Sequence, residues 1–260
     1  MAYVNLYKPP QTDTPVQLPK DDEPLDLNFC LPVPDELSSE RVKLVPFIPA
    51  LHRSQLLDGV TGNPALYTYL PYGPFDHSSV DAFNLWHEQR IRGDPSTVLF
   101  AIIDKTSPSP DSHPSQGGAL AGVIAYLLTF PQTLSTEIGH ILILPKWQRT
   151  FLNTNAVGLL LIHALEVPEN GGWGLRRVQW QANAENGPSR RAAERMGFKM
   201  EGIIRWQRLL PGANGRPSAS AKDRKGDPQP DVPGRHTAML ALCWDHYDRA
   251  SLEALMDRKK

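Results

Sequence analysis

A carboxylate and an imidazole lie within one of the most apolar segments of the sequence. Glu137 and His140 interrupt residues 134–144, which are otherwise mostly aliphatic and read as a strand. Carboxylate and imidazole side chains are common general bases, so either residue could accept a proton during a reaction. Because side chains alternate along a strand, Glu137 is expected on the same face as Ile141 and Ile143.

Glu137 is the first candidate base and His140 the second. The alternative for Glu137 is a solvated residue at a strand edge or end. A lone histidine in an apolar strand is more often a packed core residue. A bulge in this strand would change which of the two side chains faces a cleft.

A polar turn and a helix follow this strand. Pro145 ends the strand, and the helix is expected to run to about Glu166. Unpaired N–H groups and the positive end of the helix dipole make such a helix start an anion site. Asn153 or Thr154 would also serve as the helix cap, in which case the segment is an ordinary strand–helix turn. From the residues alone, the sequence indicates an anion-binding α/β domain.

A second short helix is expected at residues 186–196. Pro188 lies in its first turn and Gly197 lies just past its end, which is the usual asymmetry of a helix. Asn186 and Ser189 at its start either cap the helix or contact a ligand.

The remaining elements alternate between strands and helices in the order β-α-α-β-β-β-α-β-α-β-β. Residues 1–38 are rich in proline and are expected to form an extended arm, wrapped on a domain that spans residues 39–245. Residues 105–118 and 211–234 are expected to be mobile loops, and residues 246–260 a helical tail. The other expected strands are residues 41–47, 97–104, 119–128, 175–181, 199–210 and 236–244, and the other helices lie within 49–69 and 78–93.

Composition excludes several classes of protein. The formal net charge of −1 argues against nucleic acid or a membrane surface as the main partner. Two cysteines, Cys30 and Cys243, are too few for a disulfide framework. No apolar run approaches the ~20 residues needed to span a bilayer, and no secretory signal is visible. We expect a cytoplasmic protein without a metal site.

The two motif regions together resemble the GNAT superfamily of acetyl-CoA-dependent N-acetyltransferases. The resemblance rests on the strand, Pro145, Gln148 and the following helix, and on Asn186-x-x-Ser189 with Gly197-Phe198. It covers roughly residues 41–245 and is closest to the Rim-type (ribosomal-protein-alanine acetyltransferase-like) branch. It implies an α/β (α+β) GNAT fold, with a central mixed, mostly antiparallel seven-stranded sheet flanked by about four helices. It also implies acetyl-CoA as the cofactor.

The resemblance assigns the cofactor site to three groups of residues. Backbone groups of the strand would pair with the pantetheine arm, and the turn would bind the pyrophosphate. The family turn carries small residues where this chain has Phe151 and Asn153, so a bulky side chain there must point away from the phosphates. The cofactor-binding residues implied are Ile141, Leu142, Ile143, Gln148, Arg149, Thr150, Phe151, Leu152, Asn153, Thr154, Asn186 and Ser189.

The resemblance also implies the catalytic groups. Glu137 would act as the base for the amine, directly or through water. The tyrosine that often protonates the departing thiolate is replaced by Ala193, so Ser189, water or no acid must serve. The acceptor side would be lined by aromatic and polar residues that suit an apolar or cationic amine; the alternative is that the aromatic residues pack the two early helices. These acceptor-side residues are Tyr69, Tyr72, Trp86, Trp180 and Asn183.

Two functional hypotheses from different classes follow. The first is an enzyme that moves acetyl from acetyl-CoA to a primary amine by direct attack in a ternary complex, since no cysteine occupies a motif position. Its acceptor would be a small molecule or, as in Rim-type enzymes, a peptide or protein N-terminus. The second is a non-catalytic GNAT-fold module that binds an acyl-CoA or a partner. Nucleic acid and membrane are not expected partners, and the chain is expected to be a monomer or homodimer.

Overall fold

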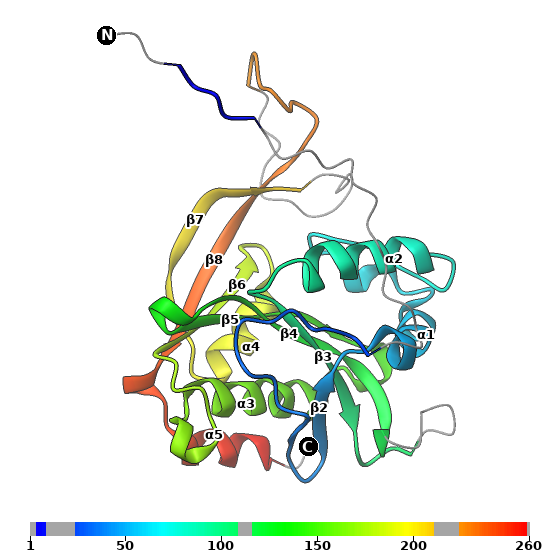
Figure 1. Cartoon of the computed structure of the whole chain (residues 1–260), viewed down its shortest axis with the longest axis vertical. Coiled ribbons are helices and arrows are strands. Elements are labelled where there is room, and N and C mark those ends of the chain that lie inside the picture. Colours follow the sequence, from blue (N-terminus) through cyan, green and yellow to red (C-terminus); the bar gives the residue numbers. More distant parts are fainter. Residues whose placement is uncertain (1–3, 9–23, 109–115, 211–223, 259–260) are drawn as a thin grey trace.

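A single eight-stranded sheet separates two sets of helices in the residues that the structure describes (Figure 1). The structure is a computed structural model and describes residues 4–8, 24–108, 116–210 and 224–258. Most of the predicted arm and parts of the two predicted mobile loops lie outside these residues.

The sheet confirms the expected mixed, mostly antiparallel arrangement. Its strand order is β1-β2-β3-β4-β5-β6-β8-β7, and only β5 and β6 are parallel neighbours. The strands are β1 (Leu37–Ser38), β2 (Val42–Pro46), β3 (Val98–Asp104), β4 (Ala119–Phe130), β5 (Ser135–Ile143), β6 (Arg177–Asn183), β7 (Lys199–Leu209) and β8 (Gly234–Cys243).

The described residues contain one strand more than the seven expected. The additional strand, β1, pairs Leu37 with Leu44 and Ser38 with Lys43 of β2. A strand of two residues has no alternating pattern, so nothing in the sequence distinguishes it from the preceding proline-rich segment.

Helices cover both faces of the sheet. The helices are α1 (Pro49–Val60), α2 (Val80–His87), α3 (Leu152–Leu165), α4 (Gly187–Arg195) and α5 (Arg249–Met256). Helices α3, α4 and α5 pack on one face, and α1 and α2 pack on the other (Figure 1). Strand β3 serves both cores, because Phe100 and Ile102 face α3 whereas Leu99 and Ile103 face the other side. This explains why β3 and β4 are almost continuously apolar.

Part of the N-terminal segment packs on the domain. Phe29 lies against Trp173 with ring centroids 5.8 Å apart, and the indole of Trp173 donates to the carbonyl of Pro32 at 3.0 Å. Val4, Leu6 and Tyr7 are exposed.

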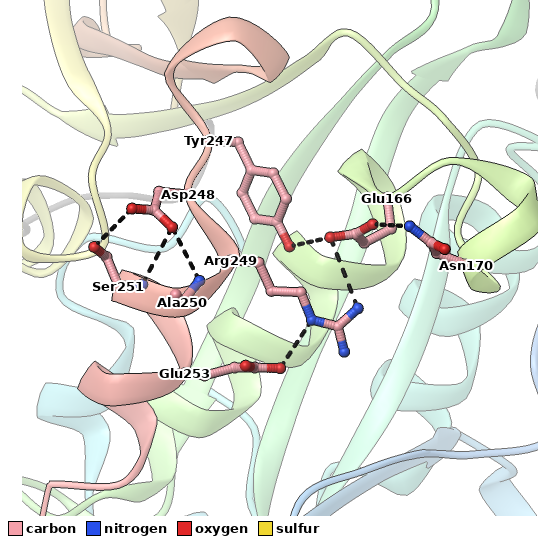
Figure 2. A network of polar contacts seen from close by, with 8 residues as sticks. All are labelled: Glu166, Asn170, Tyr247, Asp248, Arg249, Ala250, Ser251 and Glu253. Carbon is pink, nitrogen blue, oxygen red and sulfur yellow. Dashed lines mark hydrogen bonds and ion pairs between the residues drawn. The ribbon is translucent and has the colours of Figure 1, made fainter.

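Helix α5 is attached to α3 by a polar network (Figure 2). Asp248 caps α5 by accepting from the backbone N–H groups of Ala250 and Ser251. The Tyr247 hydroxyl donates to Glu166 at the end of α3 at 3.1 Å, and Arg249 lies 3.7 Å from the same carboxylate. The C-terminal segment thereby supports the helix that follows β5.

Asn155, in the first turns of α3, is buried (2% exposed) and connects the start of this helix to other segments by hydrogen bonds. Its amide nitrogen donates to the carbonyls of Phe151 at 3.2 Å and Met256 at 3.0 Å. Its amide oxygen accepts from the Ser39 hydroxyl at 2.9 Å. One side chain thus connects the β1–β2 turn, α3 and the end of α5.

Replacement of this hub should destabilise the fold. We expect Asn155→Leu to lower the free energy of unfolding by about 2–4 kcal/mol, because it removes three hydrogen bonds and leaves buried polar groups unpaired. Urea denaturation measures the change. Asn170→Leu is the matched control, because Asn170 is exposed and bonds only Glu166 in Figure 2; it should change stability by less than about 0.5 kcal/mol. Equal effects of the two substitutions would contradict the role of Asn155.

Candidate active site

The parallel strands β5 and β6 separate after only three paired residues. Ser135, Thr136 and Glu137 pair with Arg177, Val178 and Gln179. Beyond this point β5 continues to pair with β4, and β6 with β8. A cleft of about 630 Å³ occupies the gap and is lined by residues of both strands. We call this gap the strand fork.

A bulge shapes the β5 side of the strand fork. The β4–β5 register shifts between Val123 and Ala125, and His140 opposite the shift has a φ of 48°. This conformation is uncommon for a residue with a side chain. As a result Glu137 and His140 both line the cleft. The bulge therefore does not decide which of the two candidate bases faces it.

His140 packs against aromatic rings of the α1–α2 segment. Its ring lies 5.1 Å from Tyr72 and 5.7 Å from Trp86, both edge to face. The pKa of His140 is lowered to about 4, mainly by burial and in smaller part by the charges of Arg208 and Arg90. At neutral pH His140 is therefore an uncharged, packed residue, which makes it a poor proton carrier.

Glu137 is buried where the two strands part. Its side chain is 3% exposed, which overturns the alternative of a solvated strand-end residue. Burial raises the pKa of Glu137 to about 7. The positive charges of Arg208 and Arg235 and a hydrogen bond donated by Gln179 act in the opposite direction. A carboxylate with this pKa can both hold and release a proton near neutral pH, as a general base must.

The turn after β5 directs its bulky side chain away from the cleft. Phe151 is absent from the cleft lining. Its ring lies under the guanidinium of Arg41, with 4.3 Å between the guanidinium carbon and the ring centroid. Asn153, at the second small-residue position, lines the cleft. The side chain of Gln148 donates to the Ile143 carbonyl at 3.1 Å and so fixes the turn to the end of β5.

Neither Asn153 nor Thr154 caps α3, contrary to the sequence-based alternative. The helix begins at Leu152, and the Thr150 hydroxyl accepts from the Leu152 N–H at 3.3 Å. The N–H groups of Asn153 and Thr154 lie in the first turn, where a helix supplies no carbonyl partner. The start of α3 therefore has the features of an anion site.

Helix α4 brings a hydroxyl to the cleft. Asn186 caps the helix by accepting from the Ser189 N–H at 3.0 Å, as the capping interpretation predicted. The Ser189 hydroxyl accepts from the Trp180 indole at 3.0 Å, so its own hydrogen can point to a ligand. Ala193, at the position of the family tyrosine, is fully buried in the core and offers no acid.

The structure brings many of the predicted site residues together and separates others. The cleft is lined by Glu137, Ile141, Leu142, Ile143, Gln148, Asn153, Asn186, Ser189, Tyr69, Trp180 and Asn183. Its lining does not include Arg149, Thr150, Phe151, Leu152, Thr154, Tyr72 and Trp86. Tyr72 and Trp86 instead pack together, 4.5 Å between ring centroids, in the aromatic core under α2.

The lining residues that sequence reasoning missed include two arginines. Arg208 of β7 and Arg235 of β8 face the cleft. Their strands were expected, but nothing in the local sequence shows that the ends of this hairpin reach β5.

Other kinds of site find no support in the described part of the chain. There, no group of three or more His, Cys, Asp or Glu side chains is placed to hold a metal ion. Among the same residues, no helix has the length and apolar character that a membrane crossing requires.

The chain belongs to the family of GNAT acetyltransferases, because residues 41–199 match the family model described as an acetyltransferase (GNAT) domain. It is similar to the solved structure of a GCN5-related N-acetyltransferase from Brucella melitensis, with 25% identity over 86% of this chain and 85% of that chain, at a TM-score of 0.65. A probable GNAT acetyltransferase from Chromobacterium violaceum is also 25% identical, over 83% and 94% of the two chains, at a TM-score of 0.63.

More distant structures share the fold. A spermidine N-acetyltransferase from Vibrio cholerae, solved in complex with CoA and spermine, is 14% identical over 80% of this chain and 99% of that chain, at a TM-score of 0.54. A comparison with curated protein sequences gives no significant match.

The raised pKa of Glu137 predicts a pH dependence for acetyl transfer. The base form of Glu137 becomes the major form only above a pH of about 7, so kcat/KM should rise with pH through an inflection near 7. Glu137→Gln should remove this inflection and lower kcat/KM at pH 7.5 by roughly 100-fold, with little change in cofactor affinity. Steady-state thiol release measures the pH profile and kcat/KM, and calorimetric titration with acetyl-CoA measures the cofactor affinity.

The matched control is Glu253→Gln, which removes the same charge from an exposed site on α5. It should leave the pH profile unchanged. A Glu137→Gln enzyme that keeps the inflection, or that loses cofactor affinity as much as rate, would contradict the assignment.

Proposed function

We propose that this protein transfers the acetyl group of acetyl-CoA to a primary amine by direct attack within a ternary complex. The observation that carries the proposal is the position of Glu137. A buried carboxylate with a pKa raised to about 7 stands where β5 and β6 part, at the inner end of an open strand edge. Amine, base and thioester can meet at this point.

The cofactor is proposed to bind along β5 and at the start of α3. Residues Ile141 to Ile143 lie on the stretch of β5 that β6 no longer accompanies, so their backbone can pair with the amide groups of pantetheine. The pyrophosphate would lie at the first turn of α3, where free N–H groups and the helix dipole favour negative charge. Asn153 lines the cleft at this end.

Glu137 would take the proton of the amine. An alkylammonium has a pKa near ~10 and cannot attack until it is deprotonated. The nitrogen of the free amine then bonds to the thioester carbonyl carbon, and the carbon–sulfur bond breaks to release the CoA thiolate. The second proton of the nitrogen passes to this sulfur, through water or the Ser189 hydroxyl, so that the products are an amide and the CoA thiol. The hydroxyl of Ser189 on α4 lines the cleft, and in this proposal it would donate a hydrogen bond or a proton to the leaving sulfur.

Direct attack is favoured over a covalent enzyme intermediate. The two cysteines, Cys30 and Cys243, are not part of the cleft lining. We place the acceptor on the α1–α2 side of the sheet, where Tyr69 and Leu70 line the cleft. We favour a small molecule over a protein N-terminus as the acceptor, because the cleft has a volume of about 630 Å³, although the fold is shared with a ribosomal-protein-serine acetyltransferase from Vibrio cholerae, described as putative, at 15% identity.

Calorimetric titration with acetyl-CoA tests the cofactor site. We expect micromolar binding to acetyl-CoA and to desulfo-CoA, and much weaker binding to ATP. Asn153→Glu should weaken acetyl-CoA binding by roughly 10-fold or more, because it sets a negative charge against the pyrophosphate. The variant should fold, since an acidic residue is favourable in the first turn of a helix.

Asn170→Glu is the matched control, because it makes the same substitution at an exposed residue beyond the far end of α3 and outside the cleft lining. Equal weakening by both substitutions would show a general charge effect. No binding by the unmodified protein would overturn the proposal, and the reading as a non-catalytic partner-binding module would replace it. Binding without thiol release across an amine panel would indicate a module that binds acyl-CoA without turnover.

A further inference from the structure

The sheet face that carries Glu137 is polar in the region where β6, β8 and β7 adjoin the cleft. On β8, Ala238, Leu240 and Leu242 pack in the core with α3 and α4. Alternate residues of these strands therefore point to the opposite face. On that opposite face Gln179 donates to Glu137 at 3.3 Å, and Arg208 donates to Gln181 at 3.1 Å. These side chains form a polar floor under the acceptor side of the cleft.

Arg235 is the most unusual member of this floor. It is 5% exposed and lines the cleft, yet its Nε has no hydrogen-bond partner. Among the described residues its guanidinium makes neither an ion pair nor a hydrogen bond. Burial and the charge of Arg208 lower the pKa of Arg235 to about 10, so it remains charged at neutral pH.

Arg208 lies directly beside it. The two residues are register partners in the β7–β8 ladder, and both line the cleft. Within the described part of the chain, Nη2 is the only nitrogen of the Arg208 guanidinium that makes a hydrogen bond, and its partner is Gln181. Two guanidinium groups therefore converge on one region of the cleft with most of their donors unused.

The cleft does not contain enough negative charge to balance the two arginines. Glu137 is the one carboxylate among its lining residues, and with a pKa of about 7 it is only partly ionised at neutral pH. No ion pair joins it to either arginine in the described chain. A buried charge without a partner is costly, and a guanidinium is suited to bidentate contact with a carboxylate or phosphate. A bound anion would remove this cost.

The cofactor pyrophosphate is not the anion expected here. Its proposed place is the first turn of α3, which packs on the other face of the sheet. The arginines lie on the face of Glu137, toward the α1–α2 segment from which the acceptor is proposed to enter. They also lie beyond residue 199, where the match to the family model ends, so the family assignment does not explain them.

We infer that Arg208 and Arg235 bind an anionic group of the acceptor, which is therefore a primary amine that also carries a carboxylate or a phosphate. This inference rests on the proposed acetyl transfer. The same two charges oppose a polyamine acceptor. They also favour the neutral form of an amine held beside Glu137, since nearby cations disfavour its protonation.

The test compares amines of one length that differ only in their far end. Thiol release from acetyl-CoA is measured with 4-aminobutanoate, 3-aminopropylphosphonate (a stable substitute for a phosphate), butylamine and 1,4-diaminobutane. It is then measured with the corresponding sets one and two carbons shorter and with the dipeptide glycylglycine. In at least one set kcat/KM should be roughly 10- to 100-fold higher for an anionic amine than for its neutral and cationic counterparts. The carboxylate and phosphonate members distinguish the two anions.

Arg235→Met should abolish this preference. The variant should fold with an unchanged or higher melting temperature, because exchanging a buried, unpaired charge for an apolar side chain relieves its desolvation cost. Arg235→Lys should retain part of the preference. Arg205→Met is the matched control, because Arg205 is exposed on the same strand as Arg208 and does not line the cleft. If Arg235→Met does not fold, Arg208→Met makes the same test.

A preference for neutral or cationic amines would overturn the inference, as would an anion preference that survives in Arg235→Met or is lost equally in Arg205→Met. The absence of both turnover and calorimetric binding for every anionic amine would also overturn it. Acetyl-CoA titration of the same samples separates this failure from failure of the proposed function. If acetyl-CoA still binds but no anionic amine is bound or acetylated, the result counts against the arginine site and not against the proposed function.

Discussion

The separation of β5 from β6 after Glu137 is the constraint on which the rest of the site depends. Parallel neighbours in a sheet normally satisfy each other's backbone groups along their length. Here β4 holds one side of β5 and β8 holds the far side of β6, so the two strands diverge without either losing its place in the sheet. Gly122 permits close contact on the β4 side: a Cβ there would lie 2.1 Å from the Leu142 carbonyl oxygen. The divergence opens the cleft and exposes a strand edge.

The electrostatics of the cleft follow from this geometry. The strand fork buries Glu137 at its inner end, and burial disfavours the ionised form more than the two arginines favour it. The aromatic rings of Tyr72 and Trp86 cover His140 and keep it neutral. The result is one carboxyl group that titrates near neutral pH beside two fixed positive charges. This arrangement is suited to taking a proton from an amine.

The sequence was sufficient for seven of the eight described strands and for the residues that lie on β5, but not for the two-residue strand β1 and less so for residues brought in from elsewhere. Three local signals were interpreted correctly: the apolar strand around Glu137, Pro188 in the first turn of α4, and Gly197 just beyond its end. Arg208 and Arg235 carry no such signal, because their place depends on the register of β7 and β8 and on how far that hairpin extends. The direction of Phe151 depends on Arg41, more than 100 residues earlier in the chain. Tyr72 and Trp86 could be pocket or core residues on composition alone, and only packing decides between these alternatives.

The most direct test is a carbon-13 NMR titration of the Glu137 side-chain carboxyl, assigned by comparison with Glu137→Gln. It measures whether the strand fork buries this group as described. The account predicts a pKa of about 7, well above the ordinary glutamate value of 4.5. A pKa close to 4.5 would mean that Glu137 is solvated and that β5 and β6 do not enclose it. The general-base role and the charge argument for the two arginines would then both lose their basis.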